Sequence, residues 1–271
     1  MKEILLSDGN KMPAIGFGTY LMPPEDTKRC VLKALEVGYR HIDTARLYMN
    51  EEGVGEGVKE SGLDRKEVFI TTKIWTTDCY YDNAKEAVKE SLARLGVKYI
   101  DLVLVHWPPM IEDIKGAWTA LEEMHKEGKI KSLGVSNFKE HHIDRLLEFA
   151  TVRPVVNQVE LHPYFQQVKL REYCDKENIV VEAWAPLLRG KSLNDKTVIE
   201  IGKKHERTPA QVIVRWLMQE GIVPLPKSVT DSRIEENFQV FDFELDETDM
   251  EEMRGLDKNK RNFRDPDSHG F

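Results

Sequence analysis

The sequence predicts a (β/α)8 barrel preceded by an N-terminal β-hairpin. Short apolar runs alternate with segments of helical periodicity along most of the chain, and no Pro/Gly/Ser-rich linker interrupts them. Parallel neighbouring strands need crossover connections, which the helical segments supply while they cover the outside of a barrel. A length of 271 residues suits one large barrel, so we expect a single domain spanning residues 1–271.

The hairpin comes first, in residues 3–18, which read EILLSDGNKMPAIGFG. Asp8-Gly9 or Gly9-Asn10 supplies its turn between two apolar arms. Eight candidate strands follow, each a short apolar run that ends in polar or turn residues. We expect these strands in residues 15–19, 40–45, 67–74, 100–108, 130–137, 155–161, 179–186 and 221–228.

Helical spacing of apolar residues separates these strands. Lysine and glutamate fill the remaining helical positions, as in DNAKEAVKESLARLG, which is typical of solvated outer faces. The expected helices occupy residues 23–38, 51–61, 82–95, 117–127, 142–149 and 170–177, followed by a longer helical region up to residue 219.

A doubly wound sheet is the alternative fold. Its GxGxxG fingerprint is missing, because the glycine run at 53–57 follows an acidic segment rather than a strand. We therefore do not expect residues 53–57 to bind a dinucleotide phosphate.

Charge and cysteine content restrict the partners. A net charge of −8 disfavours nucleic-acid and anionic-membrane binding, which need dense basic surfaces. No apolar run has the length of a membrane span, and the start MKEILLSDGN lacks a signal core. Cys30, Cys79 and Cys174 are odd in number and widely spaced, which favours reduced thiols over disulfides or a zinc site. A cytoplasmic protein without a metal is expected.

Four polar residues follow strand-like runs at positions suited to chemistry. Asp43, Lys73 and His106 end such runs and Tyr48 lies just beyond one, and a parallel barrel presents its functional side chains at strand ends. An ammonium beside Tyr48 would favour the phenolate and ease proton exchange, with Asp43 holding the cation and His106 positioning a carbonyl. Taken singly, the same residues are explained by a helix N-cap, a solvated strand end, a half-buried aromatic and a loop histidine.

Several motifs resemble the aldo-keto reductase superfamily. They are GFGTY, HIDTARLYMNEEGVG, ITTKIW, DLVLVHWP, SLGVSNF, NQVELHPY and PLPKSVTDSRIEEN, in the order the family has them. The chain looks most like compact prokaryotic reductases of the 2,5-diketo-gluconate reductase and glyoxal or methylglyoxal reductase type. This resemblance implies Asp43, Tyr48, Lys73 and His106 as a catalytic tetrad, with hydride from a nicotinamide cofactor.

The resemblance also implies a nicotinamide site. Ser136, Asn137 and Gln158 are similar to the family's partners of the carboxamide, and Trp184 occupies the place of the ring that stacks on the nicotinamide, where many relatives have tyrosine. Ordinary polar capping and a core aromatic are the competing interpretations. Thr19, Asp43 and Leu187 complete this set of expected cofactor contacts.

A second constellation follows the last predicted strand. Backbone N–H groups and basic side chains in KSVTDSRIEEN can converge on a phosphate, which favours NADPH with weaker use of NADH. The alternative is a capped, solvated helix start. The family pattern implies that Lys227 and Arg233 contact the adenosine 2′-phosphate and that Glu236 and Asn237 approach the adenine. The expected contacts here are Lys227, Ser228, Val229, Thr230, Arg233, Glu236 and Asn237.

Substrate recognition is expected at an aromatic pocket. Tyr20, Trp75 and Trp107 follow strands where the family builds that pocket, beside Tyr48 and His106, although packing explains such aromatics equally well. Met49 borders the same pocket. The connection WPPMIEDIKG is shorter than in many animal relatives, which suggests an open pocket. The polar tail NKRNFRDPDSHGF is expected to close it in part.

The resulting hypothesis is a monomeric, NADPH-dependent reductase of aldehydes, dicarbonyls, keto acids or small sugars, with Tyr48 as proton donor. A nonenzymatic NADPH-binding sensor or interaction module is the first alternative. A Schiff-base aldolase or lyase using Lys73 is the second.

Overall fold

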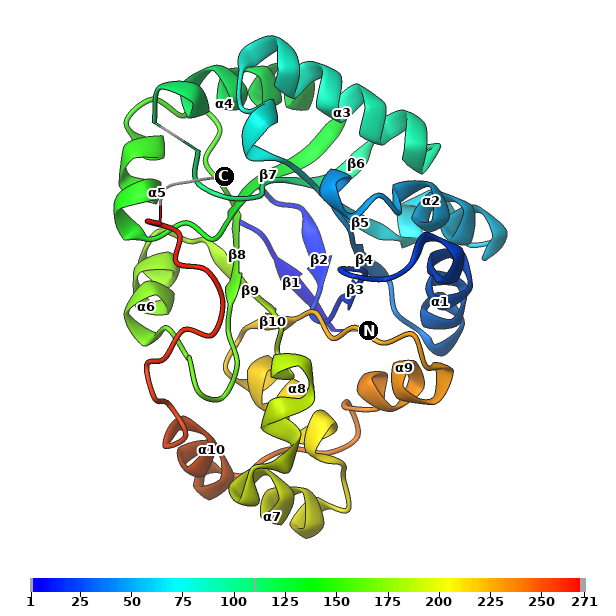
Figure 1. Cartoon of the computed structure of the whole chain (residues 1–271), viewed down its shortest axis with the longest axis vertical. Helices are drawn as coiled ribbons and strands as arrows, with labels where there is room; N and C mark the ends of the chain where they lie inside the picture. The colour runs from blue at the N-terminus through cyan, green and yellow to red at the C-terminus, as the bar shows by residue number, and fades with distance from the viewer. Residues whose placement is uncertain (1, 110, 269–271) are drawn as a thin grey trace.

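The computed structural model describes residues 2–109 and 111–268, and its centre is a ring of eight parallel strands enclosed by helices (Figure 1). The sheet order is β10-β9-β8-β7-β6-β5-β4-β3, so every strand pairs with its neighbour in the sequence. The strands are β3 (Phe17–Gly18), β4 (His41–Asp43), β5 (Phe69–Ile74), β6 (Ile100–Val105), β7 (Ile130–Ser136), β8 (Val156–Glu160), β9 (Val180–Trp184) and β10 (Val223–Pro224).

Backbone hydrogen bonds join the first and last strands of this ring. The N–H of Gly16 donates to the carbonyl of Pro224 at 3.0 Å, and the N–H of Gly18 donates to that of Pro226 at 3.1 Å. Two prolines lack the N–H groups that a longer ladder needs, so β10 is much shorter than the strand expected in residues 221–228. The predicted (β/α)8 barrel is confirmed, and the open doubly wound sheet is wrong.

The helices cover the outside of the ring (Figure 1). The expected long helical region is two helices, because Glu206 ends the first in a left-handed conformation and Thr208 caps the second with Pro209 in its first turn. The helices are α1 (Pro24–Val37), α2 (Glu51–Glu60), α3 (Tyr81–Leu95), α4 (Ile111–Lys126), α5 (Glu140–Leu147), α6 (Val168–Lys176), α7 (Lys196–His205), α8 (Pro209–Gln219), α9 (Asp231–Phe238) and α10 (Glu247–Arg254).

The predicted hairpin closes the end of the barrel where the strands begin. Its strands β1 (Glu3–Leu5) and β2 (Lys11–Pro13) pair antiparallel, and Gly9 turns between them with φ of 88°. Leu6 and Met12 are buried against side chains of the barrel interior, among them Leu102 and Val156. Figure 1 shows both hairpin strands within the outline of the ring.

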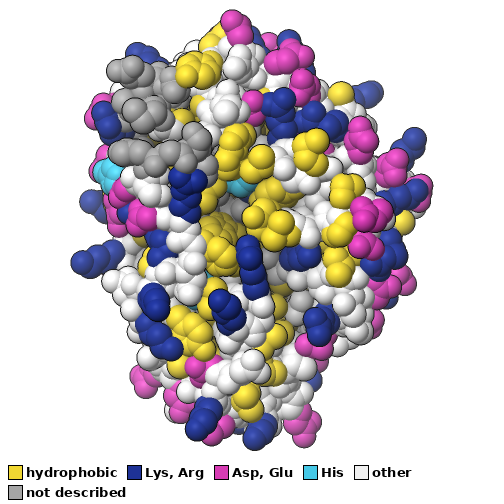
Figure 2. All heavy atoms as spheres, viewed as in Figure 1, with side chains coloured by type: hydrophobic (Ala, Val, Ile, Leu, Met, Phe, Trp, Pro, Cys, Tyr) yellow, Lys and Arg dark blue, Asp and Glu magenta, His cyan; other side chains and the backbone are white. Residues whose placement is uncertain are grey.

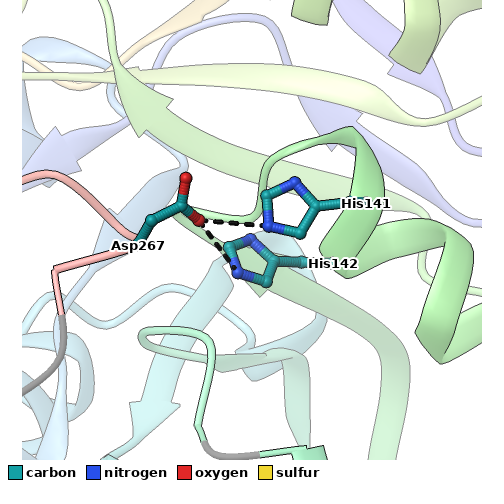
Figure 3. Close-up of side chains that lie close together, drawn as sticks. All are labelled: His141, His142 and Asp267. Atoms are coloured by element: carbon teal, nitrogen blue, oxygen red, sulfur yellow. Dashed lines mark ion pairs between the residues drawn. The ribbon is translucent and has the colours of Figure 1, made fainter.

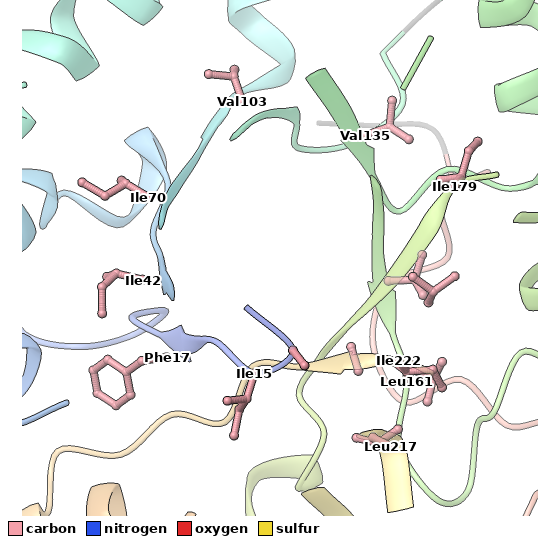
Figure 4. Packing of buried hydrophobic residues seen from close by; sticks show 14 of the residues in the cluster. Ile15, Phe17, Ile42, Ile70, Val103, Val135, Leu161, Ile179, Leu217 and Ile222 are labelled. Atoms are coloured by element: carbon pink, nitrogen blue, oxygen red, sulfur yellow. The ribbon is translucent and has the colours of Figure 1, made fainter. Parts of the chain in front are cut away.

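Successive residues of each strand point alternately outward, into the layer between strands and helices, and inward, into the barrel. Figure 4 shows Ile42, Ile70 and Val103 pointing outward from the ring, toward the helices that they pack against. Their neighbours in the strands, such as Asp43 and Thr71, therefore point into the barrel. The interior is apolar beside the hairpin and polar toward the opposite end, where the strands finish.

The glycine run at 53–57 lies in α2 and has a packing role. A Cβ atom on Gly55 would stand 2.2 Å from the carbonyl oxygen of Leu95, so glycine is required where α2 crosses the end of α3. This agrees with the expectation that the run is not a dinucleotide fingerprint. Within the described residues, none of the helices combines the length and apolar character needed to cross a membrane.

Candidate active site

The four polar residues expected to carry chemistry lie together where the strands finish. Asp43 is the last residue of β4, Lys73 is near the end of neighbouring β5, and His106 directly follows β6. Tyr48 is on the short 3-10 helix Arg46–Tyr48 after β4. Because these strands are adjacent and parallel, residues separated by about sixty positions in the chain share one end of the barrel.

Asp43 and Lys73 form a buried ion pair. Nζ of Lys73 donates to both carboxylate oxygens of Asp43, at 2.8 and 2.7 Å, and to the carbonyl of Thr44 at 2.8 Å. Lys73 is 1% exposed and Asp43 4%. All three donors of the ammonium group are therefore engaged, and its charge is balanced without water.

A buried asparagine, which the sequence analysis did not single out, secures the loops around this pair. Nδ2 of Asn50 donates to the carbonyl of Thr19 at 3.0 Å, and Oδ1 accepts from the Thr44 hydroxyl at 2.8 Å. The Thr19 hydroxyl in turn donates to the carbonyl of Asp43 at 3.0 Å. Thr19 thus supports the backbone at the ion pair, and Asn50 ties the loops after β3 and β4 together.

Tyr48 is half-buried directly beside the ion pair. Nζ of Lys73 lies 5.1 Å from the centroid of its ring, and the rings of Tyr20 and His106 lie 5.0 and 5.6 Å away. Burial raises the pKa of the Tyr48 phenol well above its usual value, and the Asp43 carboxylate raises it further. Burial and the Asp43 charge decide the direction of this pKa shift, and stabilisation of the phenolate by Lys73 during proton transfer stays a prediction.

His106 is a buried, neutral imidazole. Burial lowers its pKa well below the usual value, and the positive charge of Lys73 lowers it further. Nδ1 has no hydrogen-bond partner among the described residues. Trp75 packs edge-on against the ring with centroids 5.1 Å apart. A neutral ring with its proton on Nε2 can donate one hydrogen bond to an oxygen at the barrel mouth.

The residues expected to hold a carboxamide form one hydrogen-bonded group. Nδ2 of Asn137 donates to the carbonyl of His106 at 3.0 Å and to the Ser136 hydroxyl at 3.1 Å. The indole Nε1 of Trp184 donates to Oδ1 of Asn137 at 2.8 Å. Gln158 connects to the ion pair, since its Nε2 donates to Oδ2 of Asp43 at 2.8 Å.

A second buried carboxyl group lies beyond Gln158. Nε2 of Gln158 also donates to Oε2 of Glu182 at 2.8 Å, and Glu182 is fully buried. Glu182 was not among the residues predicted from the sequence. A glutamate inside the apolar run 179–186 was nevertheless a usable signal, because a charged residue in a buried strand needs a partner or a proton.

The candidate phosphate segment follows β10 at the same end of the barrel. Ser228 is buried and its hydroxyl accepts from the N–H of Thr230 at 3.0 Å, whereas Arg233 is exposed on α9. Nζ of Lys227 approaches the carbonyl of Leu21 at 3.3 Å. Thr230 precedes α9 and its side chain makes no cap, so the N–H groups of Asp231 and Ser232 are open to an anion, whereas those of Arg233 and Ile234 donate to the carbonyl of Thr230.

Other members of the expected cofactor set have structural contacts. Oε1 of Glu236 accepts from the Thr208 hydroxyl at 2.7 Å, and Asn237 is buried. The carbonyl of Val229 accepts from Arg29, a cation that the sequence analysis did not include. Leu187 is partly buried against the core, in the loop after β9.

The mouth of the barrel carries exposed apolar side chains. Tyr20 is 50% exposed and Met49 79%, while Trp75 and Trp107 are partly buried. Figure 2 shows hydrophobic side chains gathered around a hollow at the centre of this face. A separate cavity of about 740 Å³ lies at the opposite end of the barrel between the hairpin, α6 and the turn after α8, away from these residues.

The C-terminal segment packs against the same end. The N–H of Asn262 donates to the buried carboxylate of Glu160 at 2.7 Å, and the ring of Phe263 stands edge-on to Trp184 with centroids 5.1 Å apart. The guanidinium group of Arg189 also lies over the Phe263 ring, with its Cζ 5.0 Å from the ring centroid. The expected partial closure therefore has a physical basis in Phe263, whereas Phe271 is outside the described residues.

A polar cluster on α5 holds the end of this segment. Asp267 accepts from Lys139, and His141 and His142 point toward it with Nε2 at 3.1 and 3.4 Å from its Oδ1 (Figure 3). Nδ1 of His142 accepts the N–H of Lys139 at 3.1 Å, so in the neutral ring the proton is on Nε2 and faces Asp267. We interpret the contact between His142 and Asp267 as a hydrogen bond and not as a metal site, because this tautomer has no Nε2 lone pair for a metal ion.

Comparisons with known proteins agree with this geometry. The aldo/keto reductase family model matches residues 14–258. The glyoxal reductase of Bacillus subtilis is 45% identical over 97% of this chain and 96% of its own length, and the methylglyoxal reductase of Escherichia coli K12 is 47% identical over 98% of each.

A solved structure extends this likeness to three dimensions. The variant of Gox0644 solved in complex with NADPH has a TM-score of 0.95 and 45% identity, over 100% of this chain and 99% of that one. Similarity of sequence and of structure thus covers nearly the whole chain. The protein belongs to the aldo/keto reductase family of NAD(P)H-dependent oxidoreductases.

Proposed function

We propose that this protein reduces small aldehydes, dicarbonyls, keto acids or small sugars to alcohols with NADPH, and that Tyr48 is the proton donor. The observation that supports this most directly is the buried Asp43–Lys73 ion pair, 5.1 Å from the Tyr48 ring, with neutral His106 beside it. A neutral phenol at the barrel mouth is the form that can give a proton to a developing alkoxide.

Each residue of this group has a distinct part in the proposal. Tyr48 donates the proton to the substrate oxygen, and His106 directs that oxygen with a hydrogen bond from its neutral ring. Lys73 stabilises the phenolate that Tyr48 leaves behind, and Asp43 holds Lys73 in place. Reduction thus needs a phenol that is protonated beforehand, which agrees with the raised pKa of Tyr48.

The residues present fit a nicotinamide cofactor. The polar group of Ser136, Asn137 and Gln158 adjoins the ion pair, and Trp184 offers an aromatic face beside it. A bound nicotinamide cofactor supplies the hydride that reduces the carbonyl carbon. Thr19, in the loop after β3, and Leu187, in the loop after β9, are also proposed to contact the cofactor.

NADPH is proposed over NADH because of the segment after β10. The uncapped start of α9 presents backbone N–H groups, and the exposed guanidinium of Arg233 stands on the same helix. With Lys227 these groups suit a 2′-phosphate, and Ser228, Val229, Thr230, Glu236 and Asn237 complete the proposed contacts. Weaker use of NADH is part of the proposal, because contacts to the 2′-phosphate favour NADPH but do not prevent NADH from binding.

The substrate wall is proposed to comprise Tyr20, Trp75 and Trp107 together with Tyr48 and His106. Tyr20, Tyr48 and His106 form a chain of ring contacts at the mouth, and Trp75 extends it beyond His106. Aromatic walls of this kind suit the carbon skeleton of a small carbonyl compound.

We also propose that residues 1–271 act as a single, monomeric, cytoplasmic domain. The sheet takes strands from Phe17 to Pro224, so no cut divides the barrel into two independent units. The three cysteines are buried free thiols, which suits a reducing compartment. Light scattering of the purified protein measures its mass in solution, and a dimer would contradict the monomer.

The decisive experiment follows NADPH oxidation across a panel of aldehydes, dicarbonyls, keto acids and sugars, with Tyr48→Phe as control. Turnover in the parent protein and its loss in the variant are expected. Binding of NADPH without turnover of any compound would favour the sensor. The engaged ammonium of Lys73 argues against a Schiff-base enzyme, and borohydride should trap no substrate on it.

A further inference from the structure

The interior of the barrel contains a carboxyl group that no cation balances. Glu182 is on β9, directly opposite Gln158 of β8 in the parallel register, and its side chain is fully buried. Oε2 accepts a hydrogen bond from Nε2 of Gln158 at 2.8 Å. Oε1 has no hydrogen-bond partner among the described residues. The hydrogen bond from Gln158 and the more distant charge of Lys73 would compensate only part of the desolvation of an ionised carboxylate in such a place.

The charges around Glu182 favour its neutral form. Among the described residues, Lys73 supplies the one ammonium group that acts on Glu182, and all three of its donors are engaged by Asp43 and Thr44. Nε2 of His41 lies 3.8 Å from Oε1, but burial lowers the pKa of His41 to about 3, so its ring is neutral. The titratable and charged groups that act on Glu182 are His41 and Asp43 from β4 and Lys73 from β5. Gln158 of β8 and the apolar Val223 of β10 are its neighbours in the two adjoining strands.

Burial raises the pKa of Glu182 to about 8, and the nearby Asp43 carboxylate contributes to that rise. The protonated form therefore predominates at neutral pH. Oε2 then serves as acceptor for Gln158, and the proton resides on the otherwise unpartnered Oε1.

Glu182 and Asp43 together determine how the Gln158 amide is turned. The amide nitrogen of Gln158 has two hydrogens; one goes to Oδ2 of Asp43 and the other to Oε2 of Glu182, both at 2.8 Å. The flipped amide would place its oxygen against the Asp43 carboxylate, which is repulsive, and would leave Oε2 of Glu182 without its donor. The carbonyl oxygen of Gln158 is therefore left as an acceptor, the group that a carboxamide N–H₂ requires.

We propose that Glu182 is a positioning residue that carries a proton at neutral pH and fixes the Gln158 amide for the nicotinamide carboxamide, while adding no charge beside Asp43 and Lys73. This inference rests on the proposed function only for the identity of the cofactor. Loss of the proton in alkaline solution puts a second negative charge near the ion pair. That charge makes Tyr48 a weaker acid, so reduction slows as Glu182 ionises.

The first test measures the proton itself. Infrared difference spectra of the purified protein between about pH 6 and about pH 9 should show a carboxylic C=O band that disappears as pH rises. Glu182→Gln should abolish that band. Glu51→Gln is the matched control, because Glu51 is also buried but is paired with Arg94, and it should leave the band intact. Absence of any titrating band that depends on Glu182 would overturn the protonated carboxyl.

The second test measures positioning. Glu182→Gln keeps a neutral acceptor for Gln158, so its Kd for NADP⁺, followed by tryptophan fluorescence, should stay within about 3-fold of the parent value. Glu182→Leu removes the acceptor and should raise that Kd by about 10-fold. Equal Kd values for Glu182→Leu and the parent would overturn the positioning role. If Glu182→Leu does not fold, Gln158→Leu with the same titration takes its place, and an unchanged Kd overturns the role likewise.

The third test is the pH profile of kcat/KM. The parent should lose activity above about pH 8, whereas Glu182→Gln should hold its activity to higher pH. Identical profiles would overturn the link to Tyr48. The infrared band and the Kd values do not depend on turnover, so they distinguish failure of this inference from failure of the proposed reduction, which Tyr48→Phe tests separately.

Discussion

Lys73 donates to both carboxylate oxygens of Asp43 while its Nζ lies 5.1 Å from the centre of the Tyr48 ring. Two charges are thus buried where β4 and β5 finish, and each one makes burial of the other tolerable. The same contact prevents Lys73 from acting as a free cation. The ion pair therefore affects both the stability of the fold and the ionisation of Tyr48. Different substitutions can test these two effects separately.

Lys73→Met should destabilise the fold by roughly 3–5 kcal/mol, because it leaves the Asp43 carboxylate buried without its counterion. Urea unfolding measures the change. Asp43→Asn combined with Lys73→Met should recover a large part of the lost stability but none of the reductase activity. A double variant no more stable than Lys73→Met alone would show that the pair does not act as a compensated unit.

Tyr48→Phe should lower kcat by about 10²–10⁴-fold, the usual contribution of a positioned general acid, while the Kd for NADPH stays near the parent value. The unfolding temperature of the variant serves as a check that its structure is intact. Stopped-flow mixing with a carbonyl substrate gives the chemical step directly. Near-parental turnover in a folded variant would remove Tyr48 from the proposed role.

Lys227→Ala with Arg233→Ala should raise the KM for NADPH by about 10²-fold, since each charged contact to a phosphate contributes roughly 1.5–3 kcal/mol. The KM for NADH should change little, because NADH has no 2′-phosphate. Lys203→Ala, on exposed α7, is a control for the loss of surface charge. Parallel rises for both cofactors would count against the phosphate contact.

Stability should depend on pH through Glu182. Its pKa is raised from about 4.5 in the unfolded chain to about 8 in the folded one, so the folded state holds a proton that the unfolded state releases. The stabilisation is complete below the unfolded pKa and is lost as pH rises through the folded pKa. Between these values the free energy of unfolding should fall by up to about 1.4 kcal/mol per pH unit, and Glu182→Gln should flatten that slope. Urea titrations across this range provide the measurement, and equal slopes in both proteins would contradict the assignment.

Local pattern accounts for what could be predicted of the fold. The helix expected at 82–95 begins one residue earlier in the structure and ends at Leu95, where Gly96 provides a left-handed cap. The hairpin turn at Gly9 follows from the same kind of short-range signal. The break between α7 and α8 was missed although Thr208-Pro209 is a helix start, because amphipathic spacing continues on both sides of it.

Some features of the candidate site could likewise be predicted from the sequence, and others could not. That Asp43 and Lys73 would meet was anticipated from their places at neighbouring strand ends, and the structure brings them into contact. The raised pKa of the Tyr48 phenol was not anticipated, because burial and the Asp43 charge could not be weighed from residue types alone. The roles of the tetrad, cofactor and substrate residues stay predictions for the experiments above.

The alternation of strands and helices and the order of the motifs follow from local sequence, because hydrophobic periodicity and turn chemistry act over a few residues. Which side chains share the barrel interior depends on the closed ring of strands. Gln158 and Glu182 are separated by a whole helix in the chain, and closure and register of the ring set them side by side with Asp43. Burial there depends on the whole ring, and it raises the pKa of Glu182 and leaves Lys73 fully engaged by Asp43 and Thr44.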